Sequence, residues 1–207
     1  MEEEWELDPA FAQRDALRKA GRPVEIARTE RLILRETVEA DIPALYRIGR
    51  DPRVEPHITP MKPTLEEETE YTRAYIRHAY AFYDFGLWTV LVRHADGEST
   101  AGEQKEGGRI IGRAGLFPSE RLPGQVELGY LIAPEQQGKG YGRECAAAIL
   151  KYAFDVLELP EAHLFALPEN LVSVRVAEAL GPQERDLISS DGGRVLHYRY
   201  TQLLGRV

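Results

Sequence analysis

The sequence predicts a mixed α/β fold. Apolar runs typical of strands and amphipathic patterns typical of helices interleave through the second half of the 207-residue chain. The expected order is strand, two helices, three strands, helix, strand, helix and two strands. Because helices and strands alternate, a mixed α/β sheet is favoured over an all-helical or all-strand architecture. The length suits one domain with a short appendage.

The first part of the chain is expected to be an appendage. We expect a helical extension over residues 1–27 and the main domain over residues 28–207. Asp8 fits a helix N-cap, Pro9 fits the first helical position and Gly21 lies just past the end. The extension is also a candidate contact for a homodimer.

The first half of the main domain is expected to hold two strands and two helices. Strands are indicated over 29–36 and 87–94, and a short helix over 41–49. A second helix over 65–82 begins at a capping box formed by Thr64 and Glu67. One stripe of this helix recurs at helical spacing and is expected to face the core: Tyr71, Tyr75, Ile76, Ala79 and Phe82.

The second half of the main domain is expected to hold a loop, two helices and the remaining strands. A loop without large apolar residues is expected over 95–108. The two final strands flank the sequence SSDGG, which is a hairpin signal. The other expected elements are strands over 109–117, 124–132 and 162–167, and helices over about 140–157 and 171–181.

Charge and composition limit the partners. Acidic residues number 34 and basic residues 26, a net charge of −8, whereas binding to nucleic acid rests on Lys and Arg. This charge is compatible with cationic substrates or with plain solubility. No stretch approaches the ~20 apolar residues of a membrane span, and the acidic N-terminus differs from a secretory signal. With Cys145 as the one cysteine, we expect a cytoplasmic protein without nucleic-acid or membrane partners.

A glycine-rich turn stands between a strand and a helix in APEQQGKGYGRECAAAIL, residues 133–150. Gly138, Gly140 and Gly142 would let the backbone approach a ligand closely, and free N–H groups at a helix start bind phosphate. The spacing matches neither the Walker A loop nor the dinucleotide fingerprint. The turn therefore predicts a phosphate or pyrophosphate cradle of another kind, with a merely glycine-rich turn as the alternative.

Several motifs in order resemble the GNAT superfamily of N-acetyltransferases. VELGYLIAPEQQGKGYG is similar to its acyl-CoA-binding segment, and Gln137, Gly140 and Gly142 match the pattern there. PENLVSVRVAEALG is similar to a later CoA-contacting helix. RTERLILRETVEADIPALY resembles the opening of the branch that contains ribosomal-protein N-acetyltransferases. The resemblance spans about residues 28–204.

This resemblance implies a GNAT fold, in which a central mixed, mostly antiparallel sheet is flanked by helices. The sheet would splay between the fourth and fifth strands, 124–132 and 162–167. The pantetheine arm of acetyl-CoA would lie in that gap, held by backbone groups of Leu131 and Ala133. The residues that the resemblance assigns to acetyl-CoA are Leu131, Ile132, Ala133, Gln137, Gly138, Lys139, Gly140, Tyr141, Gly142, Arg143, Asn170 and Ser173.

Two residues are candidates for catalysis. Glu127 is a carboxylate on an otherwise apolar strand, where partial burial would raise its pKa and suit it as a general base. The alternative is an ion pair, with Arg113 on the preceding strand as a candidate partner. Ala177 stands where many family members carry a proton-donating Tyr, which makes Ser173, or water, the candidate acid. Cys145 is expected to be a buried structural thiol.

The expected activity is direct acetyl transfer from acetyl-CoA to a primary amine, with both substrates bound together. The branch favours a protein N-terminus as acceptor, with an aminoglycoside, a polyamine or an amino acid as alternatives. A non-catalytic acyl-CoA sensor, or a protein that binds another nucleotide, are further alternatives. The five histidines show no metal-binding spacing, so no metal is expected.

Overall fold

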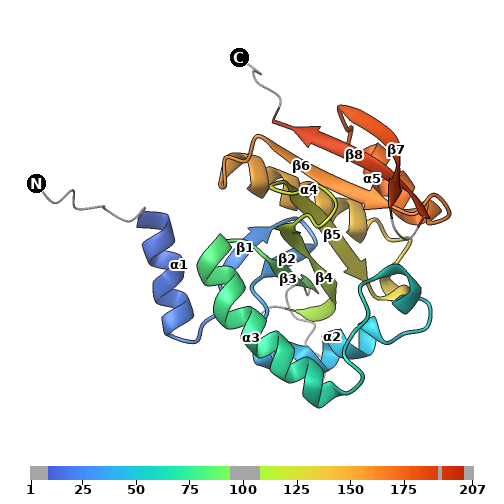
Figure 1. The fold of residues 1–207 in the computed structure, drawn as a ribbon. Helices are drawn as coiled ribbons and strands as arrows, with labels where there is room; N and C mark the ends of the chain where they lie inside the picture. Colours follow the sequence, from blue (N-terminus) through green and yellow to red (C-terminus); the bar gives the residue numbers. More distant parts are fainter. Residues whose placement is uncertain (1–8, 94–107, 191–192, 203–207) are drawn as a thin grey trace, which may run out of the picture.

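The computed structural model describes residues 9–93, 108–190 and 193–202. Its described strands form a single mixed sheet in the order β1-β2-β3-β4-β5-β6-β8-β7 (Figure 1). Every neighbouring pair is antiparallel except β5 and β6. The strands are β1 (Glu25–Arg28), β2 (Leu32–Arg35), β3 (Leu87–Val92), β4 (Arg109–Pro118), β5 (Val126–Ile132), β6 (Glu161–Ala166), β7 (Glu184–Ser190) and β8 (Gly193–Thr201).

The sheet divides at its parallel step. β5 and β6 share a single register pair, Glu127 with His163, and beyond it their carboxyl ends run apart (Figure 1). The expected splay between the strands of 124–132 and 162–167 is confirmed. A gap therefore opens beside the second half of β5.

The helices form where the sequence signals place them. Thr64 and Glu67 exchange hydrogen bonds in a capping box before α3, with the Glu67 N–H donating to Thr64 Oγ1 at 3.2 Å. Asn170 caps α5 by accepting from the Ser173 N–H at 3.1 Å. The α-helices are α1 (Pro9–Lys19), α2 (Ile42–Gly49), α3 (Leu65–Tyr83), α4 (Tyr141–Asp155) and α5 (Leu171–Ala179), and three short 3₁₀ turns are η1 (Glu39–Asp41), η2 (Glu55–His57) and η3 (Pro134–Gln136).

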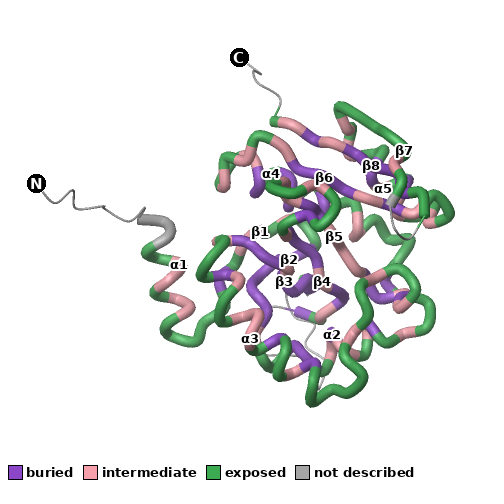
Figure 2. The backbone as a smooth tube through the Cα atoms, in the orientation of Figure 1, coloured by how far each residue is buried: buried purple, intermediate pink, exposed green. Residues whose placement is uncertain are grey.

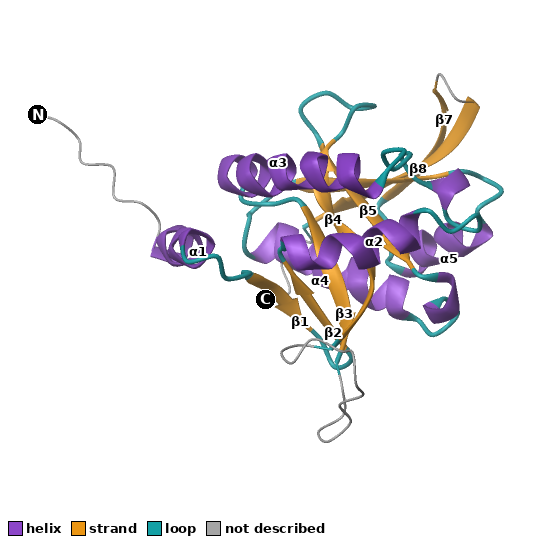
Figure 3. Cartoon of the chain, turned by 90° about the horizontal axis from the view of Figure 1, so that it is seen from below, coloured by secondary structure: helices purple, strands orange, loops and turns teal. Residues whose placement is uncertain are grey.

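Helices cover both faces of the sheet (Figure 3). Successive side chains of a strand point to opposite faces. On one face, the Arg113 guanidinium of β4 lies over the Tyr75 ring of α3, 5.5 Å from its centroid. On the other, the Tyr130 ring of β5 lies against Gly142 at the start of α4. The apolar core fills the space between this second face and α4, and Figure 2 shows the buried stretches gathered in the central strands.

Two expectations about the fold need correction. β1, which pairs with β2, was not predicted and begins inside the segment assigned to the extension, because Glu25–Arg28 is short and only half-buried. The stripe on α3 is not all core: Tyr71 is 50% exposed and Phe82 is 79% exposed. Tyr80 is the buried aromatic of this helix instead. The loop expected over 95–108 lies outside the described residues except for Gly108.

Helix α1 rests on the body through charged groups. Arg18 pairs with Glu36 at the end of β2 at 2.6 Å and with Asp84 after α3 at 2.8 Å, and Arg14 also contacts Asp84. These side chains are at most 16% exposed. Burial raises the pKa of the Glu36 carboxyl, and the Arg18 guanidinium opposes that rise. A half-buried ion-pair network thus attaches the extension to the residue that follows β2 and to the residue that follows α3.

Candidate active site

The glycine-rich turn exposes a run of backbone donors at the start of α4. Gly138 and Gly140 adopt φ values of +75° and +83°, a left-handed conformation that favours glycine. No described residue accepts a hydrogen bond from the backbone N–H groups of residues 138–143. These groups stand at the positive end of the α4 dipole. The arrangement suits a phosphate or pyrophosphate group.

A residue that the sequence analysis missed braces this turn. Arg31, between β1 and β2, donates from Nη1 to the Lys139 carbonyl at 2.9 Å and from Nε to Glu144 Oε2 at 2.7 Å. Its guanidinium also lies 4.8 Å from the centroid of the Tyr141 ring. These contacts join residues more than 100 positions apart in the chain, so no local sequence signal marks Arg31. Its position holds the turn against the edge of the sheet.

Side chains of the turn act in two ways. Gln137 Nε2 donates to the Ile132 carbonyl at 2.9 Å and so ties the turn back to the end of β5. Lys139 is exposed and donates to the neutral amide of Gln136 at 3.0 Å, which leaves its charge uncompensated there. Arg143 is exposed on the first turn of α4. Two cations therefore flank the free N–H groups.

Only alternate residues of β5 direct their backbone N–H and C=O groups into the gap. The Ala133 N–H donates to the Ile111 carbonyl of β4 at 2.8 Å. Because facing residues alternate in an antiparallel ladder, Leu131 also directs its backbone groups to β4. The N–H groups of Tyr130 and Ile132 point into the gap instead. The expectation that Leu131 and Ala133 present free backbone groups here is wrong, because the register with β4 takes them.

Glu127 lies at the closed end of the gap and is buried, with 7% of its surface exposed. The Ser119 hydroxyl donates to its Oε2 at 3.1 Å, and the Arg121 guanidinium lies 3.4 Å from its Oε1. Burial raises the pKa of the Glu127 carboxyl, while Arg121 and Ser119 partly offset the rise. Its ion-pair partner comes from the β4–β5 turn, whereas Arg113 lies over Tyr75. A carboxyl with a raised pKa in this setting suits a general base.

Ser173 faces a phenol that the sequence analysis did not include. The Tyr130 hydroxyl on β5 lies 3.1 Å from Ser173 Oγ on α5. Asn170 Oδ1 caps α5, and no described residue accepts a hydrogen bond from its amide N–H₂. The site of the absent family Tyr is closed, because Ala177 is fully buried and its carbonyl accepts from the Tyr200 hydroxyl at 2.8 Å. Tyr130 lies only three positions after Glu127, but its contact with α5 depends on the tertiary fold.

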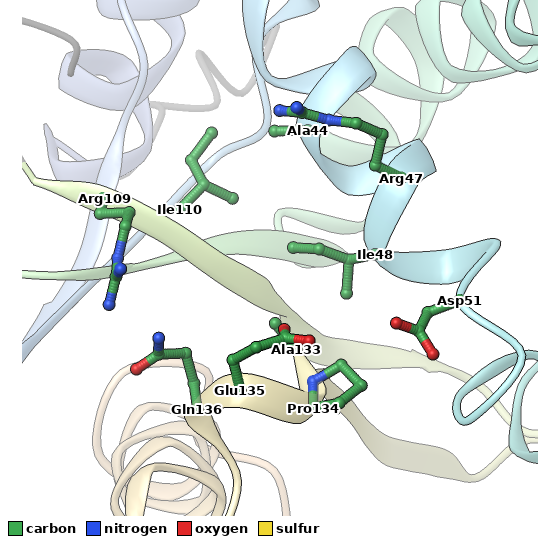
Figure 4. Close-up of a pocket in the computed structure, with 10 residues that line it drawn as sticks. All are labelled: Ala44, Arg47, Ile48, Asp51, Arg109, Ile110, Ala133, Pro134, Glu135 and Gln136. Atoms are coloured by element: carbon green, nitrogen blue, oxygen red, sulfur yellow. The ribbon is translucent and has the colours of Figure 1, made fainter. Parts of the chain in front are cut away.

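A hollow of about 350 Å³ lies between α2, the start of β4 and the segment that follows β5 (Figure 4), and Glu127 is not among its lining residues. Ala133 at its edge follows Glu127 by six strand positions, or about 20 Å at the usual rise per residue. This hollow is therefore not where an amine would meet the candidate base. Its lining residues are Ala44, Arg47, Ile48, Asp51, Arg109, Ile110, Ala133, Pro134, Glu135 and Gln136.

Other candidate chemistry finds no support. Cys145 is fully buried, and burial raises the pKa of its thiol, which confirms the expected structural role. Within the described ranges, no group of three or more His, Cys, Asp or Glu side chains could hold a metal ion. The same ranges contain no helix both long and apolar enough to cross a bilayer.

Comparison with known sequences identifies related proteins. The family model for the acetyltransferase (GNAT) domain matches residues 31–183. The Bacillus subtilis protein YkkB is 35% identical over 81 residues, 38% of this chain and 46% of YkkB, so the match spans less than half of that relative. The N-acetyltransferase p20 of Bacillus licheniformis is 23% identical over 80% of this chain and 86% of its own. Spermidine N(1)-acetyltransferase of Vibrio cholerae is 33% identical over 35% of this chain and 42% of its own.

Solved structures share the fold across most of the chain. An acetyltransferase from Agrobacterium tumefaciens is 29% identical with a TM-score of 0.65, covering 85% of this chain and 94% of that one. The aminoglycoside acetyltransferase AAC(6′)-Ib, solved in complex with coenzyme A, has a TM-score of 0.63 at 21% identity and covers 83% and 95%. The family model spans well over half of the sequence, and the splayed sheet agrees with it. The chain therefore belongs to the acetyltransferase (GNAT) family.

Proposed function

We propose that this protein transfers an acetyl group from acetyl-CoA directly to a primary amine while both substrates are bound. The observation that carries the proposal is the placement of Glu127 at the closed end of the gap whose far end meets the glycine-rich turn. A base and a phosphate-binding turn at opposite ends of one gap suit a long thioester donor and an amine nucleophile. Acetyl-CoA would supply the activated acetyl group.

The residues present fit the parts of acetyl-CoA. The free N–H groups of residues 138–143 would hold the pyrophosphate, with Lys139 and Arg143 adding charge. The backbone N–H groups of Tyr130 and Ile132 would face the pantetheine arm and polarise the thioester carbonyl. The free amide N–H₂ of Asn170 would donate to the same arm.

Glu127 would take a proton from the attacking amine. A Lys-type amine has a pKa of ~10.4 and an α-amine ~7.7–8.0, so the first needs a base more at neutral pH. We propose a protein N-terminal α-amine as the first acceptor to test, on the branch resemblance. A small cation such as spermidine is the second candidate, because the buried carboxylate and the net charge of −8 favour it.

The test is release of coenzyme A thiol when the protein is mixed with acetyl-CoA and one amine at a time. The panel contains a peptide with a free N-terminus, spermidine, an aminoglycoside and an amino acid. The same peptide with a blocked N-terminus is the control for the first acceptor. Thiol release above the background without amine supports the proposal and names the acceptor class. Tight binding of acetyl-CoA without release for any amine would contradict it and favour a sensor.

A further inference from the structure

The gap between β5 and β6 brings together two hydroxyl groups from different elements. Tyr130 OH and Ser173 Oγ are 3.1 Å apart, and both side chains are partly buried. The Tyr130 ring is fixed from a second side by Gly142, where a Cβ would come within 3.3 Å of the ring. The ring is therefore held between the first turns of α4 and α5. The backbone N–H of Tyr130 points into the same gap.

We infer that Tyr130 is the catalytic acid that protonates the departing thiolate, and that Ser173 is the positioning residue that holds its hydroxyl. This inference rests on the proposed acetyl transfer and replaces Ser173 as the acid. The last helix offers no phenol of its own, because α5 contains no tyrosine and Ala177 is buried there. Tyr200 reaches this helix from β8, but its hydroxyl already donates a hydrogen bond to the Ala177 carbonyl at 2.8 Å.

Acid strength separates the two hydroxyl groups. A phenol has an ordinary pKa of ~10 and an alkyl thiol ~8.5, so a proton moves from tyrosine to thiolate at little cost. A serine hydroxyl is a far weaker acid than either group. Burial raises the pKa of Tyr130, which keeps it protonated before transfer, and the hydrogen bond with Ser173 opposes the rise. Ser173 can turn its hydrogen toward the phenolate oxygen once the proton has left.

The bonds and protons balance in the following way. The amine nitrogen forms a bond to the acetyl carbon, and the proton lost from that nitrogen goes to Glu127. The carbon–sulfur bond breaks, and sulfur takes the proton of the Tyr130 hydroxyl. Glu127 then releases its proton to water, and Tyr130 regains one from water. The products are an amide and a free thiol, and no other reactant is needed.

Four variants test the assignment by activity. Tyr130→Phe keeps the ring against Gly142 but removes the proton, and its kcat should fall by about 100-fold or more. Ser173→Ala should fall less, and the double variant should be no slower than Tyr130→Phe, because Ser173 acts through the phenol. The matched control is Tyr152→Phe, which removes a buried phenol on α4 whose electrostatic neighbours are the α1 arginines and their acidic partners rather than Tyr130, and it should keep kcat within about twofold.

A binding measurement gives a readout that does not need turnover. Wild-type protein should bind coenzyme A about tenfold more tightly than desulfo-coenzyme A at a pH where the thiol is ionised, because the phenol donates to the thiolate. Tyr130→Phe should lose that ratio and keep its affinity for desulfo-coenzyme A, whereas Tyr152→Phe should keep both.

Wild-type kcat in Tyr130→Phe, or an unchanged affinity ratio in that variant, would overturn the inference. A larger loss in Ser173→Ala than in Tyr130→Phe would also overturn it and assign the acid to Ser173. Failure of the wild-type protein to acetylate any amine would instead refute the proposed function, and the affinity ratio would still report on the contact between Tyr130 and sulfur.

Discussion

Glu127 on β5 and His163 on β6 form the single register pair that joins the two parts of the sheet within the described residues. Because no register pair between these strands follows it, the candidate base stands at the point where the strands begin to part. Its position follows from the topology, since the residues of β5 after Glu127 pair with β4 on one side and have no register partner on β6 on the other. The fold therefore places a carboxyl group at the closed end of the gap.

Replacing Glu127 with Gln should lower turnover by about 100-fold or more, and most for amines with a high pKa. The wild-type rate should fall as the pH drops through the raised pKa of Glu127, and the variant should lack this acid limb. The measurement is kcat/KM from pH 5 to 9. Glu120→Gln, which neutralises an exposed neighbour, is the matched control and should keep the limb, moved toward lower pH because the Glu120 charge raises the pKa of Glu127. An identical pH profile in wild type and Glu127→Gln would remove Glu127 from the mechanism.

Replacing Arg121 with Gln should move the acid limb toward higher pH. The Arg121 guanidinium lowers the pKa of Glu127 from a distance of 3.4 Å, so its removal lets burial raise that pKa further. The same kcat/KM profile measures the shift. Arg185→Gln removes an equal charge at an exposed site near Glu178 and should leave the limb in place. A limb that stays or moves to lower pH would contradict the coupling between these two groups.

Replacing Gly140 with Val should abolish acetyl-CoA binding and leave the protein folded. A side chain at φ +83° costs about 1–2 kcal/mol, and a Cβ there would lie 3.3 Å from Arg31. Isothermal titration with acetyl-CoA measures the affinity, and thermal unfolding measures the strain. Gly124→Val is the matched control, because Gly124 has the same φ with open space around it, outside the turn. Equal affinities in the two variants would contradict the cradle.

The His163–His197 pair should make the protein less stable in acid. His163 Nδ1 and His197 Nε2 are 2.9 Å apart, and burial lowers the pKa of both rings. The unfolded state therefore binds more protons below its ordinary pKa of ~6.5. The stability that the two neutral rings contribute is fully present above that pH. It is lost as the pH falls toward the lowered pKa values of the folded state. His163→Gln should reduce the fall in the free energy of unfolding between pH 7 and 5 relative to wild type. Parallel plots of that free energy against pH for the two proteins would contradict this.

Local patterns were enough for most elements of the fold. The capping box of Thr64 and Glu67, the glycine-rich turn and the hairpin after β7 each depend on neighbours within a few residues, so the sequence alone placed them. β1 was missed because Glu25–Arg28 is held by pairing with β2, which local pattern does not report. Tyr71 and Phe82 follow helical spacing but lie outside the buried side, since the orientation of α3 is set by its tertiary packing.

The site was predictable where one segment supplies it. Glu127 stood out as a carboxylate in an apolar strand, and Gly138–Gly142 as costly glycines before a helix. Arg31 and Tyr130 could not be found in this way, because their roles come from contacts with Lys139 and Ser173 across the fold. The free backbone groups were misassigned by one residue because strand register decides which N–H faces the gap.

The measurement that tests the central claim most directly is a thermal-shift comparison of acetyl-CoA, coenzyme A, ATP and NAD. A ligand at 100 times its Kd adds about 2.7 kcal/mol of stability, or about 5–11 °C in Tm for a chain of this size. The account predicts a shift of that order with acetyl-CoA and coenzyme A and none with ATP or NAD. An equal shift with ATP or NAD, or no shift with either coenzyme A ligand, would contradict the assignment of the gap and the glycine-rich turn to acetyl-CoA.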